Sequence, residues 1–167
     1  SWPDKSILAG QYWHPLFVTS CYPGMITFGA AVPYHVLNRA PQIRYSQTLG
    51  NLTLSGMLVM QNDFASLGPE GTSTLYARNS GMPELAAQFI FRQGRLEVGA
   101  TGSYLSLKPR RLTLSGYLSD SFMRGFSGNL FAKVSASSFL FKLQGIYSEN
   151  ASHLVMLGGY GEASIMD

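Results

Sequence analysis

Apolar and polar residues alternate with a period of two over most of this sequence. In the segment 51–61, every second residue from Leu52 to Met60 is apolar or glycine, and Thr53 and Ser55 lie between them. Successive side chains of a β-strand point to opposite faces, so this pattern predicts a strand. The same alternation predicts seven further strands, and hence an all-β, antiparallel protein of about eight strands: 6–13, 42–48, 84–92, 95–107, 111–119, 127–136 and 138–148.

Short and long connections follow one another along the chain. Two-residue turns at 50–51, 93–94 and 136–137 predict antiparallel neighbours. The connections 14–41 and 62–83 are much longer and contain several prolines and glycines. Outer-membrane barrels have short turns at one end and long loops at the other. The alternation therefore favours a transmembrane β-barrel over a soluble meander.

The polar face of these strands carries few charges. It consists mainly of Ser, Thr, Asn, Gln and Gly, and 13% of all residues are charged, against about 25% in soluble domains. Such a face is typical of a wet lumen, with the apolar face turned to lipid. Aromatic residues near the strand ends fit interfacial girdles: Tyr12, Trp13, Tyr45, Tyr104, Tyr117 and Tyr147. A soluble ligand-binding β-barrel, with these rings in its core, is the alternative.

Several other classes are excluded by the sequence. No run approaches 18 apolar residues, which excludes a transmembrane helix. The net charge of +3 comes without any block of like charges, which argues against nucleic-acid binding. A single cysteine, Cys21, cannot form a disulfide framework or a cysteine-based zinc site.

Catalytic and metal-binding motifs are also missing. His14, His35 and His153 show no H-x-x-H or H-E-x-x-H spacing, so we expect no metal site. There is no G-x-S-x-G string, and the neighbours Ser152 and His153 would point to opposite sides of a strand. We therefore expect no enzyme and no cofactor.

Four stretches resemble a porin family of Bacteroidetes outer membranes: 8–17 (LAGQYWHPLF), 38–44 (NRAPQIR), 62–69 (NDFASLGP) and 150–159 (NASHLVMLGG). That family is similar to the DcaP-like trimeric porins, which share a GQ-x-W strand and an R-x-PQIR strand. The resemblance implies a channel for small solutes in a Gram-negative outer membrane, with a tendency toward anions and toward homotrimers. Lipid, small solutes and other outer-membrane proteins are the partners it implies.

Such porins are considerably longer than 167 residues and have more strands. We therefore expect residues 1–167 to form a single barrel domain or, as we favour, part of a larger barrel. Eight strands could instead close the smallest natural barrel, whose interior is filled by side chains.

Basic residues are the candidates for solute selectivity. Their side chains share the polar face of the strands or, for Arg39, lie in the preceding loop: Arg39, Arg44, Arg92, Arg95, Lys133 and Lys142. Fixed positive charge in a narrow channel attracts anions. The alternative is that each base pairs with a lumen acid such as Glu84 or Glu97. The pair Arg110-Arg111 would lie beside anionic headgroups.

The sequence thus predicts a porin-like channel for passive diffusion of small polar solutes, with the long loop 14–41 as its constriction. Two alternatives stay open. One is an outer-membrane barrel that conducts nothing and serves as a structural or interaction scaffold. The other is the soluble ligand-binding barrel.

Overall fold

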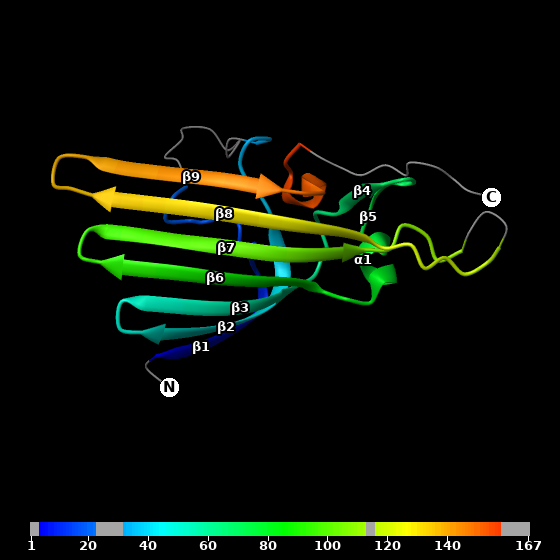
Figure 1. Ribbon diagram of the computed structural model, residues 1–167, viewed down its shortest axis with the longest axis horizontal. Helices are drawn as coiled ribbons and strands as arrows, with labels where there is room; N and C mark the ends of the chain where they lie inside the picture. Colours follow the sequence, from blue (N-terminus) through cyan, green and yellow to red (C-terminus); the bar gives the residue numbers. More distant parts are fainter. Residues whose placement is uncertain (1–3, 23–31, 113–115, 158–167) are drawn as a thin grey trace.

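The computed structural model describes residues 4–22, 32–112 and 116–157, and its main feature is one seven-stranded sheet (Figure 1). All neighbouring strands are antiparallel. The strands follow one another in this spatial order: β1 (Lys5–Trp13), β2 (Arg39–Leu49), β3 (Leu52–Val59), β6 (Glu84–Gln93), β7 (Leu96–Leu107), β8 (Met123–Ser135) and β9 (Leu140–Ser148). The all-β prediction is therefore confirmed.

The two ends of the sheet differ. The connections β2–β3, β6–β7 and β8–β9 are tight and lie together at one end, on the left of Figure 1. The long connections lie at the other end. The connection between β3 and β6 contains a small hairpin of β4 (Ser66–Gly68) and β5 (Gly71–Ser73) and the short helix α1 (Leu75–Ser80). The 3-10 helix η1 (Ala151–Leu154) follows β9 at the same end. Neither of these described helices is long and apolar enough to cross a membrane.

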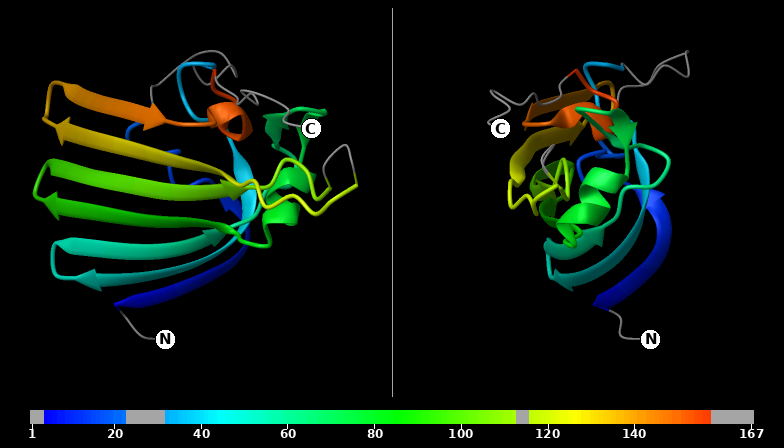
Figure 2. Two further views of the ribbon diagram at one scale, coloured as in Figure 1. Left: turned by 45° about the vertical axis from the view of Figure 1, so that its right-hand side comes forward. Right: turned by 90° about the vertical axis from the view of Figure 1, so that its right-hand side faces the viewer.

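The sheet is curved but open. Its strands follow an arc when seen along their length (Figure 2). Among the described residues, β1 and β9 are the edges and do not pair with each other. A closed barrel is therefore not formed by this part of the chain.

One predicted strand, 111–119, is wrong. Of its described residues, Leu112 and Leu118 form an isolated bridge, and the segment pairs with no strand of the main sheet. The chain leaves the sheet after Leu107, where the next backbone N–H, that of Lys108, bonds to the carbonyl of Tyr76 instead of a neighbouring strand. Gly116 then turns the chain with a φ of 82°. Residues 113–115, the loop centre 23–31 and most of the Gly-rich stretch 157–161 lie outside the described residues.

The two faces of the sheet differ in burial in the opposite sense to a soluble protein, since apolar side chains are exposed on one face and polar side chains are buried on the other. On the convex side, which we call the outer face, large apolar side chains are exposed: Ile43 by 56%, Leu130 by 68% and Leu143 by 61%. On the concave side, the inner face, polar side chains such as Gln42 and Asn129 are buried. The alternation seen in the sequence thus places the large exposed apolar residues outward, while the inner face combines polar residues with a small apolar cluster of Ala40, Met57, Val59 and Ala86.

Residues 14–22 fold back into the concave side of the arc and cover the inner face (Figure 2). The side chain of Gln88 donates to the carbonyl of Pro15 at 3.1 Å, and that of Asn129 donates to the carbonyl of Leu16 at 2.9 Å. Leu16 also packs in a small core with Val36 and with Leu154 of η1. The polar wall is thus partnered by backbone carbonyls of this inner loop, which we define as residues 14–22.

Phe131 of β8 packs against Val18 and Cys21 of the inner loop, and its ring lies close to Gly99 of β7. A Cβ at Gly99 would lie less than 3 Å from the ring of Phe131 and from the carbonyl of Phe89. Gly99→Ala is therefore expected to lower the free energy of unfolding by about 1–3 kcal/mol, because the core is overpacked. Gly102→Ala is the matched control, since nothing lies within 4 Å of the position that its added methyl group would take. Equal denaturant midpoints for the two variants would contradict the expectation.

Candidate functional site

Four of the predicted selectivity residues meet near the tight-turn end of the inner face. We call Arg92, Arg95, Lys133 and Lys142 the basic cluster. The first three line a cavity of about 210 Å³ together with Glu97. Lys142 is the cross-strand partner of Lys133. They gather because they lie on neighbouring strands or turns with the same parity, close to the same end of the sheet.

Two members of the basic cluster have assigned partners. The guanidinium of Arg92 binds Glu97, with 2.7 Å between Nε and Oε2. Nζ of Lys142 donates to the carbonyl of Tyr22 at 2.7 Å, so this ammonium holds the end of the inner loop. The cluster therefore combines a wall of positive charge with an anchor for the loop that covers it.

The other two predicted residues lie elsewhere, on β2. Arg44 faces inward, donates to Oε1 of Gln42 at 3.1 Å and stacks its guanidinium 5.3 Å from the ring of Tyr12. Arg39 has the opposite parity, is exposed, and lies over the ring of Trp13 at 5.4 Å. Neither side chain belongs to the basic cluster.

A second polar group lies at the long-loop end. His14 follows β1, Glu84 begins β6 and His153 lies in η1, and all three are buried. Nε2 of His14 is 3.1 Å from Oε1 of Glu84, and Nε2 of His153 is 3.3 Å from Oε2 of the same carboxylate. We call these three residues the His–Glu cluster. It joins the inner loop, the sheet and the segment after β9 at one point.

The remaining ring nitrogens have fixed environments. Nδ1 of His153 faces the carbonyl of Asn150 at 3.2 Å, and a carbonyl can only accept, so Nδ1 carries a hydrogen. Nδ1 of His14 accepts from the backbone N–H of Leu16 at 3.3 Å. Asn38 links the segments that contain the two histidines. Its backbone carbonyl accepts from the backbone N–H of His14, and its side-chain amide donates to the backbone carbonyl of His153.

Two imidazoles and a carboxylate are also a set of metal ligands. The ligand atoms of His14, Glu84 and His153 all lie within 4.8 Å of one another. The sequence did not predict this group, since its members lie about 70 residues apart in three segments. The single local signal in the sequence was the position of Glu84 on the polar face of its strand. The alternative in which Glu84 pairs with a lumen base does not match its contacts, because its carboxylate faces His14 and His153.

His35 lies apart from this cluster. Its Nδ1 contacts the carbonyl of Val36 at 2.8 Å and its Nε2 contacts Oε1 of Gln144 at 3.1 Å. It therefore fixes the returning part of the long connection to β9.

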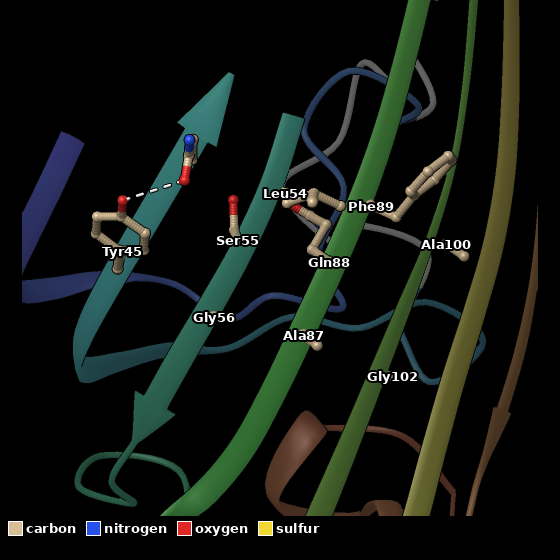
Figure 3. A pocket seen from close by; sticks show the side chains of 10 residues that line it. Tyr45, Leu54, Ser55, Gly56, Ala87, Gln88, Phe89, Ala100 and Gly102 are labelled. Carbon is tan, nitrogen blue, oxygen red and sulfur yellow. Dashed lines mark hydrogen bonds between the residues drawn. The ribbon is translucent and has the colours of Figure 1, made fainter. Parts of the chain in front are cut away.

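The outer face carries a shallow hollow of about 540 Å³ (Figure 3). Small residues of neighbouring strands, Gly56, Ala87 and Gly102, leave space that larger neighbours such as Leu54 and Phe89 border. The hollow is mainly apolar, so it belongs to the exposed apolar surface rather than to the polar inner wall.

Cys21 belongs to the inner loop and is buried against β8. Its thiol contacts the carbonyl of Ala132 at 3.7 Å. Burial raises the pKa of this thiol, and the nearby charge of Glu97 raises it further. A buried thiol with a raised pKa is unreactive, because the thiolate is the nucleophile.

No family model, curated protein or solved structure matches this chain.

Proposed function

We propose that this chain is a sector of a Gram-negative outer-membrane β-barrel that forms a porin-like channel. Small polar solutes, anions among them, would diffuse passively along its inner face. No chemical step is part of this function.

The exposure of the outer face carries the proposal. Ile43, Leu130 and Leu143 are more than half exposed, while the polar inner-face residues Thr101 and Asn129 are 3% and 2% exposed. In water, this distribution would expose a large apolar surface and favour aggregation. In a membrane, the same surface meets lipid and the polar face lines the lumen.

The ends and edges of the sheet support the same proposal. Tight turns gather at one end and long connections at the other, as in outer-membrane barrels. The edges β1 and β9 need hydrogen-bond partners within a bilayer, because no water is available there. Further strands, from a longer chain or from other copies, would supply them.

Two of the four stretches that resemble porins, 8–17 and 38–44, lie side by side. The G-Q-x-W stretch is on β1 and the P-Q-I-R stretch on β2, with Gln11 opposite Pro41. The amide of Gln42 donates to the carbonyls of Tyr12 and Trp13, at 3.0 Å each. The resemblance therefore coincides with a specific contact that ends β1 and starts the inner loop.

Ion selectivity in planar bilayers tests this function. The double variant Arg95→Glu/Lys133→Glu is expected to shift the reversal potential in a salt gradient from anion toward cation preference, because the sign of fixed charge in the lumen is inverted. Arg39→Glu is the matched control, since Arg39 lies outside the basic cluster, and its reversal potential should equal that of the unaltered protein.

Unchanged selectivity in the double variant would contradict the role of the basic cluster. A non-conducting scaffold is the second candidate, and the inner loop favours it, because Leu16 and Phe17 are buried within the arc. A protein that inserts into bilayers without any conductance would establish the scaffold. A protein that stays monodisperse without detergent would establish the soluble barrel.

A further inference from the structure

We propose that His14, Glu84 and His153 bind a divalent transition metal, with Zn²⁺ as the best fit, and that this ion clamps the inner loop and η1 to the sheet. This site is separate from the basic cluster, and its role is structural. It goes beyond the proposed channel function.

The spacing of the ligand atoms fits a shared ion. Zn²⁺ binds histidine nitrogen and carboxylate oxygen at about 2.0–2.2 Å, so two such ligands in a tetrahedral site lie about 3.3–3.5 Å apart. The separations from Glu84 to His14 and to His153 are 3.1 Å and 3.3 Å. The ligand atoms of all three residues lie within 4.8 Å of one another, so the two imidazoles and the carboxylate would draw closer around a bound ion.

The contact between His153 and Glu84 does not have the geometry of a hydrogen bond. Nε2 of His153 is buried and forms no hydrogen bond, although Oε2 of Glu84 is 3.3 Å away. An imidazolium would point its N–H at the carboxylate. Two metal ligands instead lie side by side and direct their lone pairs at a common third point.

The hydrogen bond behind His153 also suits a ligand. Its Nδ1 hydrogen is donated to the carbonyl of Asn150, and in the neutral ring this tautomer has its lone pair on Nε2. Metal-bound histidines commonly donate their other N–H to a carbonyl or carboxylate in this way. Asn38 holds this segment through its side-chain amide and the segment of His14 through its backbone carbonyl.

His14 would have to change one contact. Metal binding at its Nε2 moves the hydrogen to Nδ1, which then opposes the N–H of Leu16 at the present distance of 3.3 Å. This weak hydrogen bond must lengthen when the ion enters. The backbone amide of Leu16 is therefore expected to change its environment on metal binding.

Burial gives the ion an electrostatic role. Glu84 is 3% exposed and both histidines are 1% exposed. A buried carboxylate is unfavourable unless a cation or charge-assisted hydrogen bonds compensate it. A site with three buried protein ligands from three segments is suited to holding a fold together.

Metal titration of the whole protein in detergent tests the proposal. The protein is prepared with a tag that lacks histidine, stripped with EDTA and titrated with Zn²⁺ by calorimetry and with Co²⁺ by visible absorption. We expect one ion per chain, the intense visible bands of four-coordinate Co²⁺, and a higher melting temperature with Zn²⁺ than with EDTA.

Variants identify the ligands. Glu84→Gln and His153→Gln should weaken Zn²⁺ binding by about 100-fold or more, since ligand loss exceeds the 10- to 100-fold effect of outer-shell changes. His35→Gln is the matched control, because His35 is buried in the same connection but outside the cluster. It should bind Zn²⁺ as the unaltered protein does.

Absence of saturable binding to the unaltered protein, which requires no variant to fold, would overturn the proposal. Binding that is lost in His35→Gln and kept in both ligand variants would overturn it as well. Neither outcome bears on the reversal potential, so failure of the metal site and failure of the channel function are distinguished.

Discussion

Replacing Leu130 by Arg is expected to reduce the stability of the chain in a bilayer by about 2–4 kcal/mol, the cost of a cation at the midplane of a membrane barrel. Leu130 lies in the middle of β8 on the outer face and is 68% exposed. If this face meets lipid, the guanidinium must be taken out of water. If it met water, the substitution would be neutral, because a surface Leu has little to lose.

Leu118→Arg is the matched control for that experiment. Leu118 is 81% exposed but lies in the long connection beyond the end of β7. Urea titrations of both variants in lipid vesicles, followed by tryptophan fluorescence, give the comparison. A midpoint for Leu130→Arg equal to that of Leu118→Arg would argue that the outer face is not exposed to lipid.

Most of the main sheet could be predicted because the signal of a strand is local. The pattern of Leu52, Leu54 and Leu58 fixes both the strand and the face that each residue takes, and the turn after Leu49 fixes its partner. The same reasoning placed Lys133 and Lys142 on one face, and the register then makes them neighbours. Local parity is thus enough to assemble the basic cluster.

The alternation pattern gave wrong predictions where contacts with distant parts of the chain determine the local structure. The sequence of residues 111–119 alternates as clearly as that of β3. The chain nevertheless leaves the sheet after Leu107, because α1 packs against the end of β7 and the carbonyl of Tyr76 accepts the next backbone N–H. The helix α1 has only six residues, too few for a helical period to show. The sequence predicts Arg39 in a loop before a strand that begins at residue 42, whereas β2 already begins at Arg39 and directs its side chain outward.

The His–Glu cluster could not be predicted from the sequence for another reason. Its three residues lie in a loop, at a strand start and in a single-turn helix, and none has a motif neighbour. Their meeting depends on the inner loop folding into the arc and on η1 packing behind it. Such convergence is set by long-range packing, which no spacing rule in the sequence encodes.

Loss of the two amides that hold the inner loop is expected to make Cys21 reactive. In the variant Gln88→Leu/Asn129→Leu, the buried carbonyls of Pro15 and Leu16 lose their donors. Each loss costs about 1–3 kcal/mol. The lower end of the combined cost, about 2 kcal/mol, populates the detached loop about 30-fold more, so a thiol reagent should label Cys21 at least about 30-fold faster when opening precedes labelling.

Cys21 reports this opening cleanly because it is the single cysteine of the chain. In the docked loop, burial and Glu97 raise the pKa of its thiol, so the thiolate is scarce. In the detached loop the pKa returns toward its ordinary value, and labelling gains from access and from ionisation together.

Ser46→Ala is the matched control, because Ser46 bonds Ser55 on the same inner face and not the inner loop. Equal labelling rates in the double variant and in Ser46→Ala would mean that these amides do not hold the loop, and that Lys142 and the His–Glu cluster are sufficient to keep it in the arc.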